Sequence, residues 1–346
     1  MIRLHWKPIA SVDDARAMLQ KAIGIEFGTL PPYLYAMFSI PPGKNVQAEA
    51  RIRSVALQEM IHMCLACNIL NAIGGDPVIT APVYPGPLPG DIGPPHGDPL
   101  IIHLLPFSEA AMAQGVAIEE PEHPPDFPVE RLMALEAAPD AVTIGQFYAA
   151  LDAFLSTLPP SAWYCGRNQI TDAQFFPGQL FAVNKYADAH QAIQNIVSEG
   201  EGTPQANNPL DFQHELAHYY RFGECQRNLV LQKANNPLGY QWGPETLNID
   251  WSAVYPAIAD PGSHDFSKDP PAAQAAQKAC NDTYTRMIDA LQQAVTGTAG
   301  QLGEAVRAMF DLRMAARVAL TTPLADPSQV AGPSFLYTPS NNGASS

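Results

Sequence analysis

Two Glu-x-x-His units carry the clearest chemistry in this sequence. The first joins Glu59 to His62, and the second joins Glu215 to His218. On a helix, this spacing puts a carboxylate and an imidazole on one face, one turn apart, so both can reach one metal ion. Helical bundles use the unit twice, each with one further Glu, to hold two metals. The pattern therefore predicts a site for two metals, with iron expected and manganese or zinc as alternatives.

The second unit can also be divided differently. Residues 214–224, HELAHYYRFGE, contain His-Glu-x-x-His, in which His214 and His218 would share a zinc and Glu215 would activate water. A third ligand is hard to find, because Glu224 would lie too far along the same predicted helix. A zinc hydrolase also leaves the first Glu-x-x-His unit unused, so it is the second hypothesis.

Each unit needs a partner carboxylate from another helix. Glu26 stands between apolar neighbours, where an acid is costly unless a cation neutralises it, and the turn at 41–45 lies midway between Glu26 and Glu59. For the other half, the candidates are Glu199 and the position of Gln146, and glutamine is a poor ligand. The predicted metal ligands are Glu26, Glu59, His62, Glu199, Glu215 and His218, and all except Glu199 are also the predicted catalytic residues.

Helical periodicity dominates the chain, which predicts a mainly α protein. We expect Pro31-Pro32 to kink or interrupt the first helix. Segments 76–107 and 234–270 are rich in turn residues, and we expect them to be ordered excursions from a single domain over 1–325, followed by a tail at 326–346. The predicted helices cover about 12–30, 46–73, 108–116, 129–137, 143–157, 181–199, 211–233, 271–296 and 299–321.

Composition excludes several classes of function. The chain has 346 residues, 47% of them apolar, and 34 acidic against 19 basic side chains, a balance that argues against nucleic-acid binding. No segment predicts a membrane span, and the N-terminus lacks an apolar signal core. The 5 scattered cysteines do not form a disulfide framework, and Cys64-x-x-Cys67 is interpreted as two buried thiols. We therefore expect a cytoplasmic protein without a membrane or nucleic-acid partner.

Several longer stretches together resemble a known family. The chain is similar to the ferritin-like domain associated with iminophenyl-pyruvate dimer synthases, which couple two oxidised aromatic amino acids in violacein and indolocarbazole pathways. The matching stretches are IEFGTLPPYLYAMFSI (25–40), LQEMIHMCLACNILNAIGG (57–75), TIGQFYAAL (143–151), AIQNIVSEGEG (192–202), HELAHYYRFGE (214–224) and AGPSFLYTP (331–339). The resemblance implies a ferritin-like helical bundle, and the helices predicted at 271–296 and 299–321 would be extra C-terminal helices beside it.

The resemblance also sets expectations for function. In the dimer synthases this domain is one part of a much longer polypeptide, and the family pattern implies Glu where Gln146 stands, so one metal would be held weakly or be missing. The first hypothesis is a di-iron oxidase or oxygenase that uses O2 and a small aromatic or amino-acid-derived substrate, with two irons per chain. Non-catalytic metal storage and a scaffold without turnover remain alternatives, and a homodimer is left open.

Overall fold

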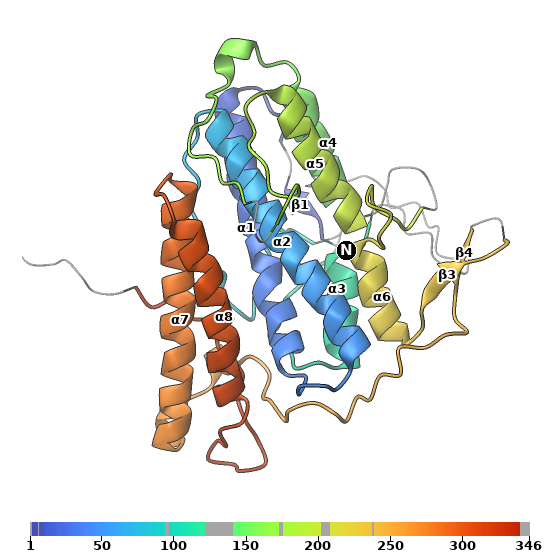
Figure 1. Cartoon of the computed structure of the whole chain (residues 1–346), viewed down its shortest axis with the longest axis vertical. Coiled ribbons are helices and arrows are strands. Elements are labelled where there is room, and N and C mark those ends of the chain that lie inside the picture. Colours follow the sequence, from blue (N-terminus) through green and yellow to red (C-terminus); the bar gives the residue numbers. More distant parts are fainter. Residues whose placement is uncertain are drawn as a thin grey trace, which may run out of the picture.

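The computed structural model describes residues 2–5, 7–93, 97–121, 141–172, 176–201, 208–236 and 239–339. Over these residues the protein is a helical bundle with two short β-ribbons, which confirms the predicted mainly α class (Figure 1). The ribbons pair β1 (Leu4–His5) with β2 (Ala141–Val142) and β3 (Leu231–Lys233) with β4 (Tyr240–Trp242), both antiparallel. The predicted helix at 129–137 lies outside the described residues.

Two long helices form an antiparallel hairpin at the centre of the bundle. Helices α1 (Val12–Phe38) and α2 (Val46–Ala72) have 27 residues each. The side chain of Ser11 caps α1 by accepting a hydrogen bond from the backbone N–H of Asp14. Most residues of both helices are buried, because the hairpin is covered on more than one side. The turn predicted at 41–45 joins them and sets their relative height.

The predicted interruption of α1 at Pro31-Pro32 is wrong. The helix continues to Phe38 with both prolines inside it. Pro32 has no N–H to donate to the carbonyl of Gly28, and the hydroxyl of Tyr84 donates to that carbonyl instead, at 2.5 Å. The excursion at 76–107 therefore supplies a hydrogen bond that the helix lacks, and the helix does not need to break.

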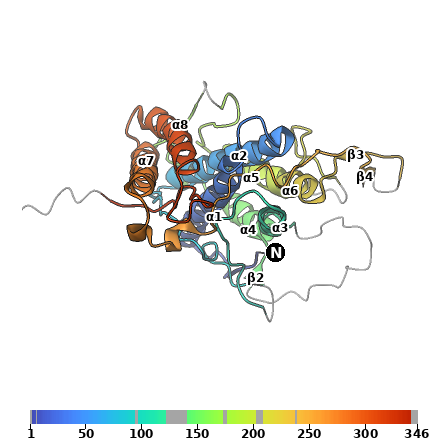
Figure 2. The same cartoon turned by 90° about the horizontal axis from the view of Figure 1, so that it is seen from below.

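Four shorter helices complete the bundle beside the α1/α2 hairpin, arranged as two pairs. Helices α3 (Glu109–Ile118) and α4 (Ile144–Leu155) lie one below the other along α1. Helices α5 (Tyr186–Glu201) and α6 (His218–Arg227) do the same along α2, with α4 beside α5 and α3 beside α6 (Figures 1 and 2). The gap between α3 and α4 and the gap between α5 and α6 both lie near the middle of the hairpin. Ends of these four helices therefore meet there.

The helix predicted from residue 211 begins only at His218. Residues 208–217 form a turn in which the Asp211 carboxylate accepts hydrogen bonds from the backbone N–H groups of Gln213 and Glu215. His214 has a positive φ of 65°, which no α-helix allows. The prediction of one continuous helix over 211–233 is therefore wrong at both ends, because α6 stops at Arg227 and residues 231–233 form β3.

The C-terminal helices form a second hairpin against the first. Helices α7 (Pro271–Val295) and α8 (Gln301–Ala319) lie on the side of α1 and α2 away from α5 and α6 (Figures 1 and 2). Residues 330–335 are buried, and Phe335 packs edge to face on Tyr284, so the first part of the segment predicted as a tail is ordered. Residues 340–346 lie outside the described residues.

Helix α2 is long and apolar enough to cross a membrane by length and composition alone. However, 83% of its most apolar window is buried inside the fold, as expected for the core helix of a bundle. Its hydropathy is explained by the helices packed around it.

Candidate metal centre

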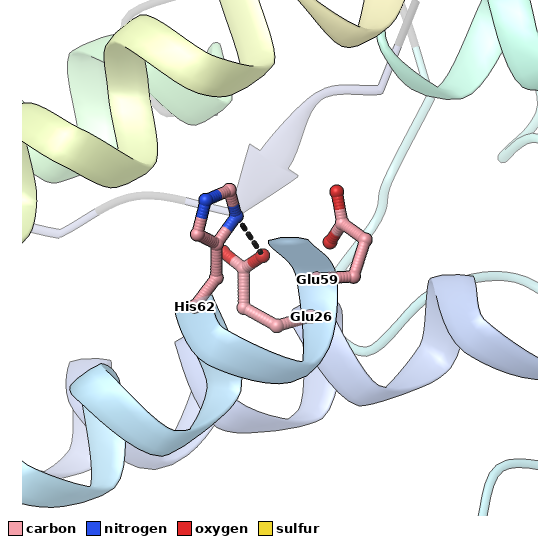
Figure 3. Close-up of side chains that lie close together, drawn as sticks. All are labelled: Glu26, Glu59 and His62. Atoms are coloured by element: carbon pink, nitrogen blue, oxygen red, sulfur yellow. Dashed lines mark ion pairs between the residues drawn. The ribbon is translucent and has the colours of Figure 1, made fainter. Parts of the chain in front are cut away.

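The structure brings five possible ligands together where the short helices end. Among the residues that the structure describes, two groups of side chains have ligand atoms within 4.8 Å of one another, namely Glu26, Glu59 and His62, and Glu59, Glu119 and His218. Figure 3 shows the first group, with Glu26 from α1 facing Glu59 and His62 from α2. Glu59 belongs to both groups, so the two form one continuous centre in which Glu59 can bridge two metal positions.

The first group is held by contacts from three elements. Nδ1 of His62 lies 3.5 Å from Oε2 of Glu26, the interaction marked in Figure 3. The Tyr148 hydroxyl of α4 donates to Oε1 of Glu26 at 2.5 Å, and the Thr29 hydroxyl lies 3.1 Å from Oε2 of Glu59. Glu26, Glu59 and His62 are all buried. The carboxylates are thus fixed in position and largely removed from bulk solvent.

The second group has the same composition and a similar arrangement. Oε1 of Glu59 and Oε2 of Glu119 lie 2.7 Å and 3.6 Å from Nδ1 of His218. The Tyr33 hydroxyl donates to Glu119 at 2.5 Å, as Tyr148 does to Glu26. Glu119 is the residue that ends α3, and His218 is the first residue of α6.

One buried nitrogen in this group fits a metal better than a hydrogen bond. Nδ1 of His218 has no hydrogen-bond partner among the described residues, although Oε1 of Glu59 is only 2.7 Å away. A buried lone pair without a partner is costly. A cation between this nitrogen and the nearby carboxylates would satisfy it, so these residues fit a metal ion.

The hydrogen bonds of His218 assign its tautomer. Oε1 of Gln58 lies 2.6 Å from Nη1 of Arg221 and 3.1 Å from Nε2 of His218. A guanidinium can only donate, so the Gln58 atom facing it is the oxygen, and Nε2 of His218 must donate to the same oxygen. The proton of the neutral imidazole is therefore on Nε2, which leaves Nδ1 free to bind a metal.

The shifted pKa values of Glu59 and His62 also indicate that this cluster of side chains suits a cation. Burial, together with the carboxyls of Glu119 and Glu26, raises the pKa of Glu59 well above its usual range. Burial alone would lower the pKa of His62, but its hydrogen bonds with Glu199 and Glu26 outweigh burial and raise that pKa to about 10. So many acids in one buried place need positive charge, which protons supply when no metal is present.

The remaining predicted ligands lie elsewhere. Glu199 is buried at the end of α5, but its Oε2 is 2.8 Å from Nε2 of His62, on the far side of the ring from Glu26. Glu215 is exposed and, among the described residues, belongs to neither group. Its backbone N–H and carbonyl bond to Asp211 in the turn before α6, so the Glu215-x-x-His218 unit is not one turn of helix.

Gln146 is not at the site. It is the third residue of α4, exposed, and its side-chain oxygen accepts a hydrogen bond from the backbone N–H of Thr143 in a capping box. The side chain of α4 that does reach the metal centre is Tyr148. A ligand at position 146 is therefore not what the centre lacks.

Sequence reasoning missed Glu119 as the second partner carboxylate. It follows the apolar Ile118 at the end of α3 and stands before Glu120 and Pro121. The acidic pair at a helix end was a weak signal, because periodicity alone cannot show that a helix stops level with Glu59. The structural role of Glu119 depends on where α3 ends.

A small cavity borders the carboxylates of Glu26, Glu59 and Glu119. Its volume is about 40 Å³, and Ile118, Ile144 and Ile196 line its apolar part. That is room for a few water molecules, and it is smaller than a cavity of about 150 Å³ that holds a benzene ring. The cavity can therefore admit O2 or water next to the carboxylates.

Comparisons with known proteins agree with this architecture. The Ferritin-like family model matches residues 19–227, more than half of the chain and every residue of the two ligand groups. A ferritin-like protein from Caulobacter vibrioides superposes with a TM-score of 0.65, at 22% identity, over 96% of this chain and 100% of that one. At this identity the match supports the fold alone.

A curated relative is similar in sequence. The 2-imino-3-(indol-3-yl)propanoate dimerase of Chromobacterium violaceum is 27% identical over 268 residues, which cover 65% of this chain. The match spans only 24% of that relative's length. It agrees with the resemblance to dimer synthases seen in the sequence.

Proposed function

Because the chain belongs to the Ferritin-like family, we propose that it is a non-haem di-metal oxidase or oxygenase acting on a small aromatic or amino-acid-derived substrate. The observation that carries the proposal is the pair of carboxylate and histidine groups that share Glu59. Iron is the metal proposed, with two per chain, because carboxylate-rich sites with one His per metal suit iron and manganese.

Each side chain of the centre has a distinct task in this proposal. Glu26 and His62 would hold one metal, Glu119 and His218 would hold the other, and Glu59, which belongs to both groups, would be shared between them. Tyr148 and Tyr33 keep Glu26 and Glu119 in place by hydrogen bonds, which limits the ligand movement that a looser site would allow. Two redox-active metals bound here would supply electrons to O2.

The protein around the centre controls what can reach it. One wall of the neighbouring cavity is apolar, because Ile118, Ile144 and Ile196 line it. Its volume of about 40 Å³ suits O2. In a two-electron oxidation, the substrate would lose two electrons and two protons, and O2 would take them up as hydrogen peroxide. The aromatic substrate class is proposed from the likeness to the dimerase, which acts on an indole-containing imino acid according to its name.

The zinc hydrolase hypothesis loses its structural basis. His214 is exposed in a turn and His218 begins α6, so the two do not share a helical face as a zinc pair would. The cytoplasmic location expected from the sequence remains a proposal, as does the homodimer.

Elemental analysis of protein purified without chelator tests the metal centre. We expect close to two irons, or iron plus manganese, per chain, and loss of both in Glu59→Gln, which keeps the shape of the side chain but removes the bridging charge. The matched control is Glu215→Gln, which removes an exposed carboxylate and should keep both metals. One zinc that survives Glu59→Gln but is lost in Glu215→Gln would overturn the proposal and restore the hydrolase.

Oxygen consumption tests the catalytic part. Protein reconstituted with Fe²⁺ under anaerobic conditions should consume O2 faster when aromatic amino acids or their imino acids are added. Glu59→Gln should abolish the increase. Two bound irons without any substrate-dependent uptake would contradict an oxidase and favour metal storage.

A further inference from the structure

We infer that the two metal positions differ in affinity, and that the position of His62 fills before the position of His218. The inference rests on the proposed di-metal centre. It concerns the residues behind the two imidazoles, Glu199 and Gln58, which belong to neither ligand group.

The two positions match in the types of ligand that face the metals. Each has one His and one Glu of its own, and both share Glu59. Each of the unshared carboxylates accepts a tyrosine hydroxyl at 2.5 Å, Glu26 from Tyr148 and Glu119 from Tyr33. The clearest chemical difference between the two positions lies in the groups behind the imidazoles.

Behind His62 stands a negative charge. Nε2 of His62 lies 2.8 Å from Oε2 of Glu199, and Oε1 of Glu199 accepts a hydrogen bond from Gln213 at 3.1 Å. The carboxylate is buried and fixed at both oxygens. A carboxylate that accepts the outer N–H of an imidazole makes the opposite nitrogen a stronger metal ligand.

Behind His218 stands a neutral amide that is already engaged by a positive charge. The Gln58 oxygen accepts from Nη1 of Arg221 at 2.6 Å as well as facing Nε2 of His218 at 3.1 Å. An amide oxygen that is shared with a guanidinium accepts the N–H of the imidazole less strongly than a carboxylate does. The opposite nitrogen, Nδ1 of His218, is therefore less basic and is the weaker metal ligand. The positive charge of Arg221 also opposes a second cation nearby.

The carboxylate behind His62 and the positive charge of Arg221 near His218 both favour metal binding at the His62 position, so their effects add. Loss of a hydrogen-bonding partner behind a metal ligand typically changes metal affinity by about 10–100-fold. We expect the two dissociation constants of the centre to differ by a factor within about that range. A metal supplied at one equivalent per chain would then collect at the His62 position.

Titration of metal-free protein with Co²⁺ tests the inference, because its visible absorption and the heat of binding both report each step. Wild type should bind two Co²⁺ in two resolved steps. His218→Ala should keep the tight step, and His62→Ala should keep only the weak one. Two steps of equal affinity in wild type would overturn the inference.

Variants of the backing residues separate their role from a structural one. Glu199→Gln should weaken the tight step by about 10–100-fold, whereas Gln58→Glu should strengthen the weak step, a gain that misfolding cannot produce. Glu215→Gln removes the same charge from the neighbouring segment without touching either imidazole, and should leave both steps unchanged. If Glu199→Gln and Gln58→Glu leave both steps unchanged, the inference is wrong while the di-metal centre stands; if wild type binds no Co²⁺, the centre itself is wrong.

Discussion

A comparison of two buried tyrosines, one at the candidate metal centre and one away from it, isolates the effect of a single hydroxyl. Tyr148 donates to Glu26 at 2.5 Å, whereas the hydroxyl of Tyr284 has no hydrogen-bond partner among the described residues. Both rings are almost fully buried, with 1% of each side chain exposed. The two positions therefore differ in hydrogen bonding and resemble each other in packing, which makes them a matched pair.

Removing the two hydroxyls should have different consequences. In metal-free protein, Tyr148→Phe should lower the free energy of unfolding by about 1.5–3 kcal/mol, because a buried carboxylate loses a donor. Tyr284→Phe should be close to neutral or stabilising, because no described bond is lost. Urea unfolding in the presence of a chelator measures both values, and equal losses would contradict the role given to Tyr148.

The cysteines predict a pattern of chemical reactivity. Burial raises the pKa of Cys64 to about 12, and Cys67, Cys225 and Cys280 are buried as well, whereas Cys165 is exposed. A thiol reacts as its thiolate, so at neutral pH only Cys165 should react quickly in the native protein. Ellman's reagent should count one fast thiol per native chain, none in Cys165→Ser, and five after unfolding of wild type. A fast Cys64 would show that α2 opens readily.

At the scale of elements, the start of α4 decides the role of Gln146. Its side chain completes the capping box with Thr143, and Glu serves this position as well as Gln does. Gln146→Glu should therefore leave both stability and metal content unchanged, and Gln146→Ala should lower the free energy of unfolding by about 0.5–1 kcal/mol. Thermal unfolding and elemental analysis measure these outcomes. A gain of metal in Gln146→Glu would instead show that position 146 supplies a ligand.

The central hairpin could be predicted from the sequence, whereas the short helices could only partly be. Periodicity and the turn at 41–45 were enough to set Glu26 level with Glu59, because long regular helices leave little freedom. The start of α6 depends on a turn built around Asp211, which periodicity does not report. That turn removes Glu215 from the second group, while the end of α3 supplies Glu119 and α5 places Glu199 behind His62.

At the scale of the whole molecule, the proposed metal centre joins parts of the chain that are far apart in sequence. Its proposed ligands come from α1, α2, the end of α3 and the start of α6, so the centre can form only when these elements have packed. A metal that binds the folded chain and not the unfolded one stabilises the fold by mass action. Metal content should therefore control the stability of the entire bundle.

Metal removal should lower the melting temperature of the whole protein. At a free metal concentration one hundred times the dissociation constant, one site contributes about 2.7 kcal/mol, which corresponds to a shift of several degrees. We expect calorimetry to show this shift on adding Fe²⁺ anaerobically to chelator-treated wild type, and none in Glu59→Gln. Glu215→Gln should shift as wild type does, because its exposed carboxylate lies outside both groups. A shift that survives Glu59→Gln would mean that the stabilising metal binds elsewhere, and the shared carboxylate would lose its central role.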